Sequence, residues 1–158
     1  MEFNISAFDV FDKDWALLTA GDMESYNTMT ISWGGLGTLW SKPVSTVYVK
    51  PIRHTHSFME KSDIFTVSFY PGSCREALGV LGTLSGRDCD KVKSAGLTPL
   101  ALEGAVTFAE AKVTLVCKKL YRQDQDTAPM PEDVISAYYK TEAAHTMYIG
   151  QVIDVIKG

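Results

Sequence analysis

Two short stretches of the sequence carry residue types that could bind a ligand. Residues 27–37 alternate polar and apolar side chains and then pass through a tryptophan into three glycines. Residues 50–56 place Arg53, His54 and Thr55 at the expected start of a helix. Free amides and the positive end of a helix dipole stabilise an anion there, and an arginine adds a forked, charge-assisted contact. The two stretches predict a site that lays a flat aromatic ligand along a strand and holds its anionic tail at a helix start.

Plainer interpretations of these residues stay open. Arg53 could be a solvated surface residue and Thr55 only an N-cap. The three glycines, Gly34, Gly35 and Gly37, could let a ligand approach the backbone closely or could form a plain flexible turn. Their spacing matches neither G-x-G-x-x-G nor G-x-x-x-x-G-K-[ST], so both nucleotide-binding fingerprints are excluded.

The three histidines do not predict a metal centre. His54 and His56 alternate in one turn, and His145 could add a third ligand, but there is no acidic or cysteine partner at suitable spacing. His145 could instead orient an electron donor or transfer a proton, since imidazole titrates close to neutral pH.

Alternation with period two dominates the chain and predicts strands. The expected strands cover residues 15–20, 26–32, 44–49, 65–70, 109–118 and 147–156, with a turn at residues 21–25. Core or partner-interface packing is expected for Trp40.

Fewer segments have helical spacing. Ser73 and Glu76 form a capping box that predicts a helix start, and Gly86 should end that helix. Further helices are expected at residues 54–61, 88–95 and 132–139, the last opened by a proline. Because strands outnumber helices and no regular βαβ alternation exists, we expect a mainly β fold, an antiparallel β barrel with short helical insertions.

Length and composition fit one soluble domain over residues 1–158. With a net charge of −4, we expect no broad surface for binding DNA or RNA. From residues 1–4 we expect no secretory signal, and no apolar run in the sequence reaches the length that a membrane span requires. Cys74, Cys89 and Cys117 lack CxxC spacing and are expected to be reduced thiols in a cytoplasmic protein.

Further pieces of sequence follow in a definite order: WALLTAG at residues 15–21, KPV at 42–44, LSGRD at 84–88, Lys91, GLTP at 96–99 and HTMYIG at 145–150. Together with the two stretches above, they resemble the flavin reductase-like, FMN-binding split-barrel family, and within it the flavoredoxin-type branch. The resemblance runs from residue 15 to about residue 154. It implies a Greek-key split barrel that forms a homodimer, with one FMN per subunit near the interface and electrons commonly supplied by NADH or NADPH.

The resemblance also implies roles for individual residues. Main-chain groups of residues 27–30 would run beside the flavin ring, Trp33 would pack on the ligand, and residues 53–55 would hold the phosphate. His145 would lie near the face that a nicotinamide or substrate approaches, as a candidate catalytic residue. Met29 stands where some relatives have a small hydroxyl residue. The implied cofactor-binding residues are Asn27, Thr28, Met29, Thr30, Ser32, Trp33, Arg53, His54, Thr55 and Lys91.

Three functional hypotheses follow. The leading one is a flavin-dependent oxidoreductase, an NAD(P)H-dependent flavin reductase in which FMN carries out the redox chemistry. The alternative is a flavoredoxin-like electron-transfer protein that carries FMN, exchanges electrons with a redox protein partner and has no nicotinamide turnover of its own. A third is a β-barrel interaction domain whose ligand site has decayed, which the joint presence of Asn27, Arg53, Thr55 and Lys91 disfavours.

Overall fold

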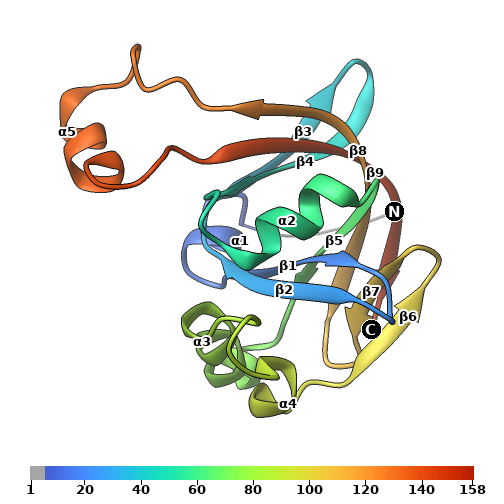
Figure 1. Cartoon of the computed structure of the whole chain (residues 1–158). Helices are drawn as coiled ribbons and strands as arrows, with labels where there is room; N and C mark the ends of the chain where they lie inside the picture. The colour runs from blue at the N-terminus through green and yellow to red at the C-terminus, as the bar shows by residue number, and fades with distance from the viewer. Residues whose placement is uncertain (1–5) are drawn as a thin grey trace.

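The computed structural model describes residues 6–158, and its main feature is a seven-stranded antiparallel sheet (Figure 1). The strand order is β2-β1-β5-β8-β9-β4-β3. This confirms the expected mainly β fold with short helices. Residues 1–4, on which the expectation about a secretory signal rests, lie outside the described part of the chain. The strands of this sheet are β1 (Ala16–Gly21), β2 (Tyr26–Ile31), β3 (Gly34–Leu39), β4 (Lys42–Val49), β5 (Ile64–Phe69), β8 (Val113–Asp124) and β9 (Thr146–Lys157).

A link of two residues, Ser32 and Trp33, joins the strands at the two opposite edges of the sheet. A flat sheet of this size would hold its edges about 29 Å apart, but the link can span only about 11 Å. The sheet must therefore curl until β2 and β3 approach each other. Within residues 6–158 these two edge strands are not hydrogen-bonded to each other, so the curled sheet stays split at this point.

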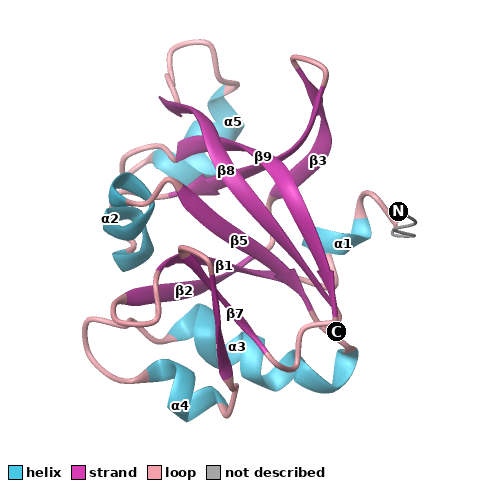
Figure 2. Ribbon diagram, turned by 90° about the vertical axis from the view of Figure 1, so that its right-hand side faces the viewer, coloured by secondary structure: helices cyan, strands magenta, loops and turns pink. Residues whose placement is uncertain are grey.

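The two longest strands, β8 and β9, run across the whole molecule (Figure 2). Register shifts at Val116/Cys117 and Lys119/Tyr121 mark irregularities in this pair, which increase strand bending and twist. Beyond the last pair, Asp124 with Thr146, residues 125–145 form an arm that stands out from the body (Figure 1). The arm carries α5 (Glu132–Val134) and the π-helical turn η2 (Ile135–Tyr139), in the segment where a helix was expected.

The strand expected at residues 109–118 is displaced in the structure. Residues 105–108 form β7 (Ala105–Phe108), which pairs with β6 (Pro99–Leu102) in a separate two-stranded sheet. The chain then turns, with the Ala111 amide donating to the Phe108 carbonyl at 3.1 Å, and β8 begins only at Val113. Residues 109–112, whose alternation predicted a strand, therefore form a turn between two strands of different sheets.

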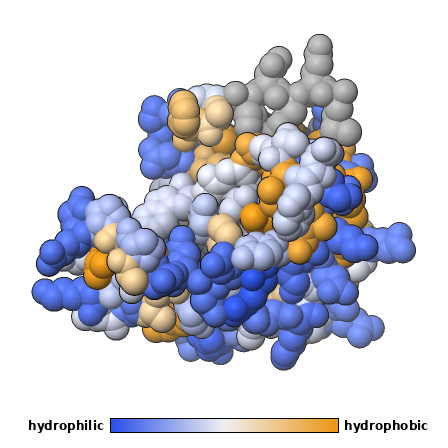
Figure 3. Space-filling view, turned by 90° about the horizontal axis from the view of Figure 1, so that it is seen from above, coloured by the Kyte–Doolittle hydropathy of each residue, from blue (hydrophilic) through white to orange (hydrophobic). Residues whose placement is uncertain are grey.

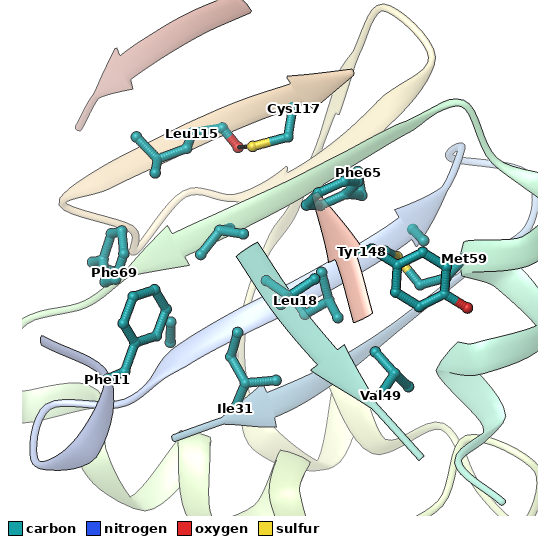
Figure 4. Close-up of a cluster of buried hydrophobic side chains, with 14 of the residues drawn as sticks. Phe11, Leu18, Ile31, Val49, Met59, Phe65, Phe69, Leu115, Cys117 and Tyr148 are labelled. Carbon is teal, nitrogen blue, oxygen red and sulfur yellow. Dashed lines mark hydrogen bonds between the residues drawn. The ribbon is translucent and has the colours of Figure 1, made fainter. Parts of the chain in front are cut away.

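Strand β1 is buried on both faces because its neighbouring side chains enter two different clusters. Leu18 joins a cluster inside the curled sheet with Phe65, Met59 and Tyr148 (Figure 4). Its neighbour Leu17 joins the second cluster, which lies beneath the helices that follow β5. The helices that complete these clusters are α1 (Asp9–Asp12), α2 (His54–Lys61), α3 (Arg75–Thr83) and α4 (Lys91–Ala95).

Helix α2 has the predicted bounds, whereas α3 and α4 begin differently from the prediction. A 3-10 turn, η1 (Gly72–Cys74), precedes α3, and the Cys74 amide donates to the Pro71 carbonyl at 2.9 Å. That main-chain bond replaces the expected capping box, and Cys74 is the N-cap without a side-chain bond. Helix α4 starts at Lys91 behind the N-cap Asp90, later than expected, and ends at Gly96 as predicted.

The glycine-rich stretch is strand β3, so the interpretation as a flexible turn is wrong. Gly35 and Gly37 pair with Thr46 and Val44 of β4. The hairpin between β3 and β4 turns at Trp40 and Ser41, both with positive φ, as in a type I′ turn. Trp40 is 62% exposed there, which excludes the core packing considered for it.

Gly150 of β9 offers a test of this packing. A Cβ at this position would lie 2.5 Å from the Phe65 ring and 2.9 Å from the Cys117 Cβ, whereas one at Gly37 would meet nothing within 4 Å. We expect Gly150→Ala to lower the free energy of unfolding by about 1–3 kcal/mol through overpacking. The matched variant Gly37→Ala should change it by less than about 0.5 kcal/mol. Urea unfolding of both variants measures this, and equal effects would contradict the packing described.

Candidate functional site

A cavity of about 650 Å³ lies beside the split edge of the sheet. Its size is within the range of small-molecule and cofactor sites. The cavity is bounded by β2, the link that follows it, the start of α2, the end of α3 with the loop after it, and the base of the arm. Ten of the eleven predicted site residues line it: Asn27, Met29, Thr30, Ser32, Trp33, Arg53, His54, Thr55, Lys91 and His145.

Strand β2 presents an unpaired edge to this region. In the part of the chain that is described, β2 pairs with β1 alone. Every residue of a strand carries an amide donor and a carbonyl acceptor, so those on the free edge are available to a planar ligand. Thr28, the predicted residue that does not line the cavity, is fully buried and bonds through its hydroxyl to Thr19 at 2.9 Å. Its main chain alone remains for the predicted contact.

Asn27 ties this strand to the start of α2. Its amide Nδ2 donates to the Thr55 hydroxyl at 2.8 Å, and both side chains are buried. The Thr55 hydroxyl keeps its own proton for a further acceptor. The loop after α3 closes on the same point, because a Cβ at Gly86 would collide with Asn27 Oδ1. Gly86 was expected only to end a helix, and the structure shows that it lets the loop approach Asn27.

Three cations surround the start of α2. Arg53 is the N-cap of this eight-residue helix and makes no side-chain capping bond, while Arg87 and Lys91 come from the loop and helix that follow α3. Arg87 is held by a bond from Nη1 to the Ile52 carbonyl at 2.9 Å. With a helix dipole added, this corner favours an anion that carries more than one negative charge.

Lys91 is a buried amine, with 5% of its surface exposed. Its Nζ donates to the Leu81 and Leu84 carbonyls, both at 3.3 Å, and so closes the end of α3. Burial, together with the nearby Arg53 charge, lowers the pKa of Lys91 to about 8. Burial and the charges of Arg87 and Lys91 also lower the pKa of His54. Basic side chains whose pKa is lowered inside a cleft are typical of a binding site.

Another part of the cavity wall, called the aromatic end below, contains His145 and two aromatic side chains. The Trp33 ring lies 5.3 Å from the His145 ring and 5.0 Å from the Tyr138 ring, measured between centroids. Burial, and after it the charges of Lys50 and Arg53, lower the pKa of His145 to about 4 against the opposing effect of Glu142. His145 is therefore a neutral imidazole at pH 7, which leaves it the role of orienting a ligand rather than that of a cationic acid.

Lys50 attaches the arm to the body at this end. Its Nζ donates to the Tyr138 carbonyl at 3.0 Å and pairs with the Glu142 carboxylate at 2.5 Å. Sequence reasoning missed Lys50, Arg87 and Glu142 as cavity residues. Lys50 and Arg87 stand inside stretches that were already singled out, whereas nothing in the sequence marks Glu142, which is distant along the chain.

The histidines do not converge on one point. His56 turns toward β9, where its Nε2 lies 2.9 Å from the Thr146 hydroxyl. Among residues 6–158, no group of three or more histidine, cysteine or acidic side chains is arranged to hold a metal ion. No helix in the described part of the chain has the length and apolar character that crossing a membrane would require.

Comparison with known proteins assigns the family. Residues 10–157 match the flavin reductase like domain, so the chain belongs to that family. A search of curated proteins finds no match.

Solved structures of similar fold include flavoredoxin from Methanosarcina acetivorans (18% identity, TM-score 0.73, covering 100% of this chain and 75% of that chain). An FMN-binding protein from Thermus thermophilus with bound 1-cyclohex-2-enone has 18% identity and a TM-score of 0.73, and the match covers 99% of this chain and 80% of that chain. An NADH:FAD oxidoreductase from Streptomyces globisporus has 18% identity and a TM-score of 0.70, and the match covers 92% of this chain and 75% of that chain. At these identities the likeness establishes the shared fold.

The depressed pKa of His145 predicts a pH effect on stability. Because the folded value of about 4 lies below the ordinary 6.5, the unfolded chain binds more protons between these pH values. The contribution of His145 to stability is therefore present above pH 6.5 and is lost as the pH falls toward 4. We expect His145→Asn to lose less stability than the native protein between pH 7 and pH 5, by on the order of 1 kcal/mol. Urea unfolding at both pH values measures this, and an equal loss in the two proteins would contradict it.

Proposed function

We propose that this protein binds FMN and acts as an NAD(P)H-dependent flavin reductase. The observation that carries the proposal is the meeting, across one cavity, of the unpaired edge of β2 with three cations at the start of α2. A flat ring with hydrogen-bonding edges fits the free edge of β2, and a phosphate ester fits the three cations. Family membership adds to this support.

The residues present fit FMN. Its phosphate carries close to two negative charges and needs several donors, which the free amides of α2, Arg53 and Thr55 can supply. Lys91 lies beside them as a buried amine whose protonation an anion would favour. Trp33, 42% exposed at the cavity, offers a flat apolar surface to the ring. When bound, FMN supplies electron and hydride transfer, and the protein supplies binding, orientation and electrostatics.

The aromatic end of the cavity is the place for the electron donor. Trp33, Tyr138 and neutral His145 form part of the cavity wall there. A nicotinamide ring can pack against such a wall. The similarly folded NADH:FAD oxidoreductase supports a nicotinamide donor for this chain.

A second candidate is a flavoredoxin-like carrier that passes electrons from bound FMN to a protein partner. The likeness to a flavoredoxin favours it, and no nicotinamide-binding motif is visible in the sequence. Steady-state NADH and NADPH oxidation with free flavin as acceptor separates the two. Rapid turnover supports the reductase, and a tightly held flavin with negligible turnover supports the carrier.

We also propose that the protein works as a homodimer with FMN near the subunit interface. Large apolar side chains are exposed around the cavity, among them Trp33, Ile52 and Tyr138. In the view of Figure 3, apolar residues lie in small groups among hydrophilic ones. A second subunit would cover such groups and exclude water from the flavin ring.

For the compartment we propose the cytoplasm, since Cys74, Cys89 and Cys117 are all free thiols.

Arg53 provides the test of the flavin site. We expect purified protein to bind FMN with a yellow absorbance spectrum, and Arg53→Gln to weaken FMN binding about 10- to 100-fold through loss of a charge-assisted bond. Riboflavin, which lacks the phosphate, should bind both proteins equally. Lys61→Gln removes a charge from the opposite end of the same helix and serves as the control. Fluorescence titration measures the affinities of the three proteins for FMN and riboflavin, and a native protein that binds neither flavin would refute the proposed function.

Lys91 predicts how FMN affinity depends on pH. Its pKa of about 8 means that the amine loses its proton as the pH rises from 7 to 9, and with it the attraction for a phosphate. We expect FMN affinity to fall about tenfold over this range in the native protein. Lys91→Met should bind more weakly at pH 7 and show a flat profile. Lys93→Met, which changes an exposed lysine of the same helix, should keep the native profile; a native profile in Lys91→Met would contradict the prediction.

A further inference from the structure

A chain of three side chains closes the neck of the arm, directly behind the cavity. The Tyr139 hydroxyl lies 2.8 Å from His145 Nδ1 and donates to Gln125 Oε1 at 3.3 Å. The Gln125 main-chain N–H donates to the His145 main-chain carbonyl at 3.0 Å. His145 lines the cavity, whereas Tyr139 and Gln125 do not. The two residues therefore support His145 from its rear side.

The chemistry of this chain determines which nitrogen of His145 carries the proton. An amide oxygen accepts hydrogen bonds and does not donate them, so the Tyr139 proton points to Gln125. The Tyr139 oxygen is then the acceptor for a proton on His145 Nδ1. Burial also raises the pKa of Tyr139, so the phenol keeps this proton. Since the imidazole is neutral at pH 7, its other nitrogen, Nε2, is left with a lone pair.

This lone pair lies on the part of the ring that is turned away from Tyr139. His145 is 9% exposed and contributes to the cavity wall, and its ring is tilted by 55° against the Trp33 ring. A ligand that packs on Trp33 would thus meet a hydrogen-bond acceptor at its edge. A primary carboxamide brings an N–H to such an acceptor, whereas a carboxylate brings a second lone pair and a negative charge.

The arm keeps this arrangement in place through its attachment to the body. Lys50 Nζ lies 5.6 Å from the centre of the Tyr139 ring while it bonds the neighbouring Tyr138 carbonyl and Glu142. Tyr139 is therefore fixed from one side by Lys50 and from the other by Gln125 and His145. Second-layer partners of this kind commonly set the tautomer and orientation of a functional histidine.

We infer that Tyr139 is a positioning residue that, with Gln125, holds His145 in the Nδ1–H tautomer, so that Nε2 accepts a hydrogen bond from the carboxamide of the ligand that binds against Trp33. The part of this inference that concerns the ligand rests on the proposed function, since it names the chemical group by which the electron donor is recognised. The part that concerns the tautomer rests on the hydrogen-bond chain alone.

Nitrogen-15 NMR of the imidazole tests the tautomer without any ligand. At pH 7 we expect native His145 to show a protonated Nδ1 and an unprotonated Nε2, and Tyr139→Phe to shift the ring toward the Nε2–H form. Tyr121→Phe removes a similar tyrosine-to-glutamine bond, 2.9 Å long, on an exposed part of β8 and should leave the signals unchanged. A protonated Nε2 in the native protein overturns the inference, even if the Tyr139 variant does not fold.

Kinetics test the recognised group. We expect the native enzyme to prefer NADH over its analogue with a nicotinic acid ring by about tenfold or more in KM, and Tyr139→Phe to reduce this preference roughly three- to tenfold with a smaller change in kcat. Gln125→Glu keeps an acceptor behind Tyr139 and should preserve the preference. Equal use of both nucleotides by the native enzyme overturns the carboxamide assignment. Absence of turnover with either nucleotide would instead count against the reductase function, and the NMR result would still decide the tautomer.

Discussion

The site depends on the short connection between the two edges of the main sheet. Ser32 and Trp33 must reach from β2 to β3, so seven strands curl until their edges approach. The same constraint leaves β2 without a second partner strand within the described residues, and it places Trp33 between the edges. A backbone edge that would otherwise invite another strand instead borders a cavity, and the aromatic side chain of the link stands at that cavity's wall. The short link therefore accounts both for the curling of the sheet and for the position of the cavity beside β2.

Electrostatics at the start of α2 complement this backbone edge. Arg53, Arg87 and Lys91 converge, although the charge of Arg53 lowers the pKa of Lys91 and the charges of Arg87 and Lys91 lower the pKa of His54. Such a concentration of like charge costs stability unless something compensates it. Lys91 is partly compensated by two carbonyls at the end of α3, but Arg53 makes no capping bond. An anion at this corner would relieve the repulsion, which is why the arrangement fits binding better than it fits a purely structural role.

The sequence predicted the parts of the molecule that local signals determine. The period-two alternation located β2 and β5, and α2 was predicted with its observed bounds. In β5 the alternation separates apolar from polar side chains, although every residue after Ile64 is buried. Strand β3 was missed because glycine has low strand propensity, and pairing with β4 overrides that propensity. The ion pair between Lys50 and Glu142 was also beyond sequence reasoning, since it joins residues 92 positions apart through the bend of β8 and β9. The family resemblance located the candidate site residues along the chain, and nearly all of them line the cavity. Their individual roles depend on contacts that sequence spacing does not reveal.

The two ends of the cavity are built from different parts of the structure. The cationic end consists of helix starts and loops that are tied to the buried core through Asn27, Thr55 and Lys91. The aromatic end depends on the arm, which stands out from the body and is attached to it at this point through Lys50. Rigid elements suit a group that must be held for many turnovers, whereas a protruding segment suits a ligand that must enter and leave. The division of the cavity would therefore suit the function proposed above, with FMN binding at the cationic end and the electron donor approaching at the aromatic end.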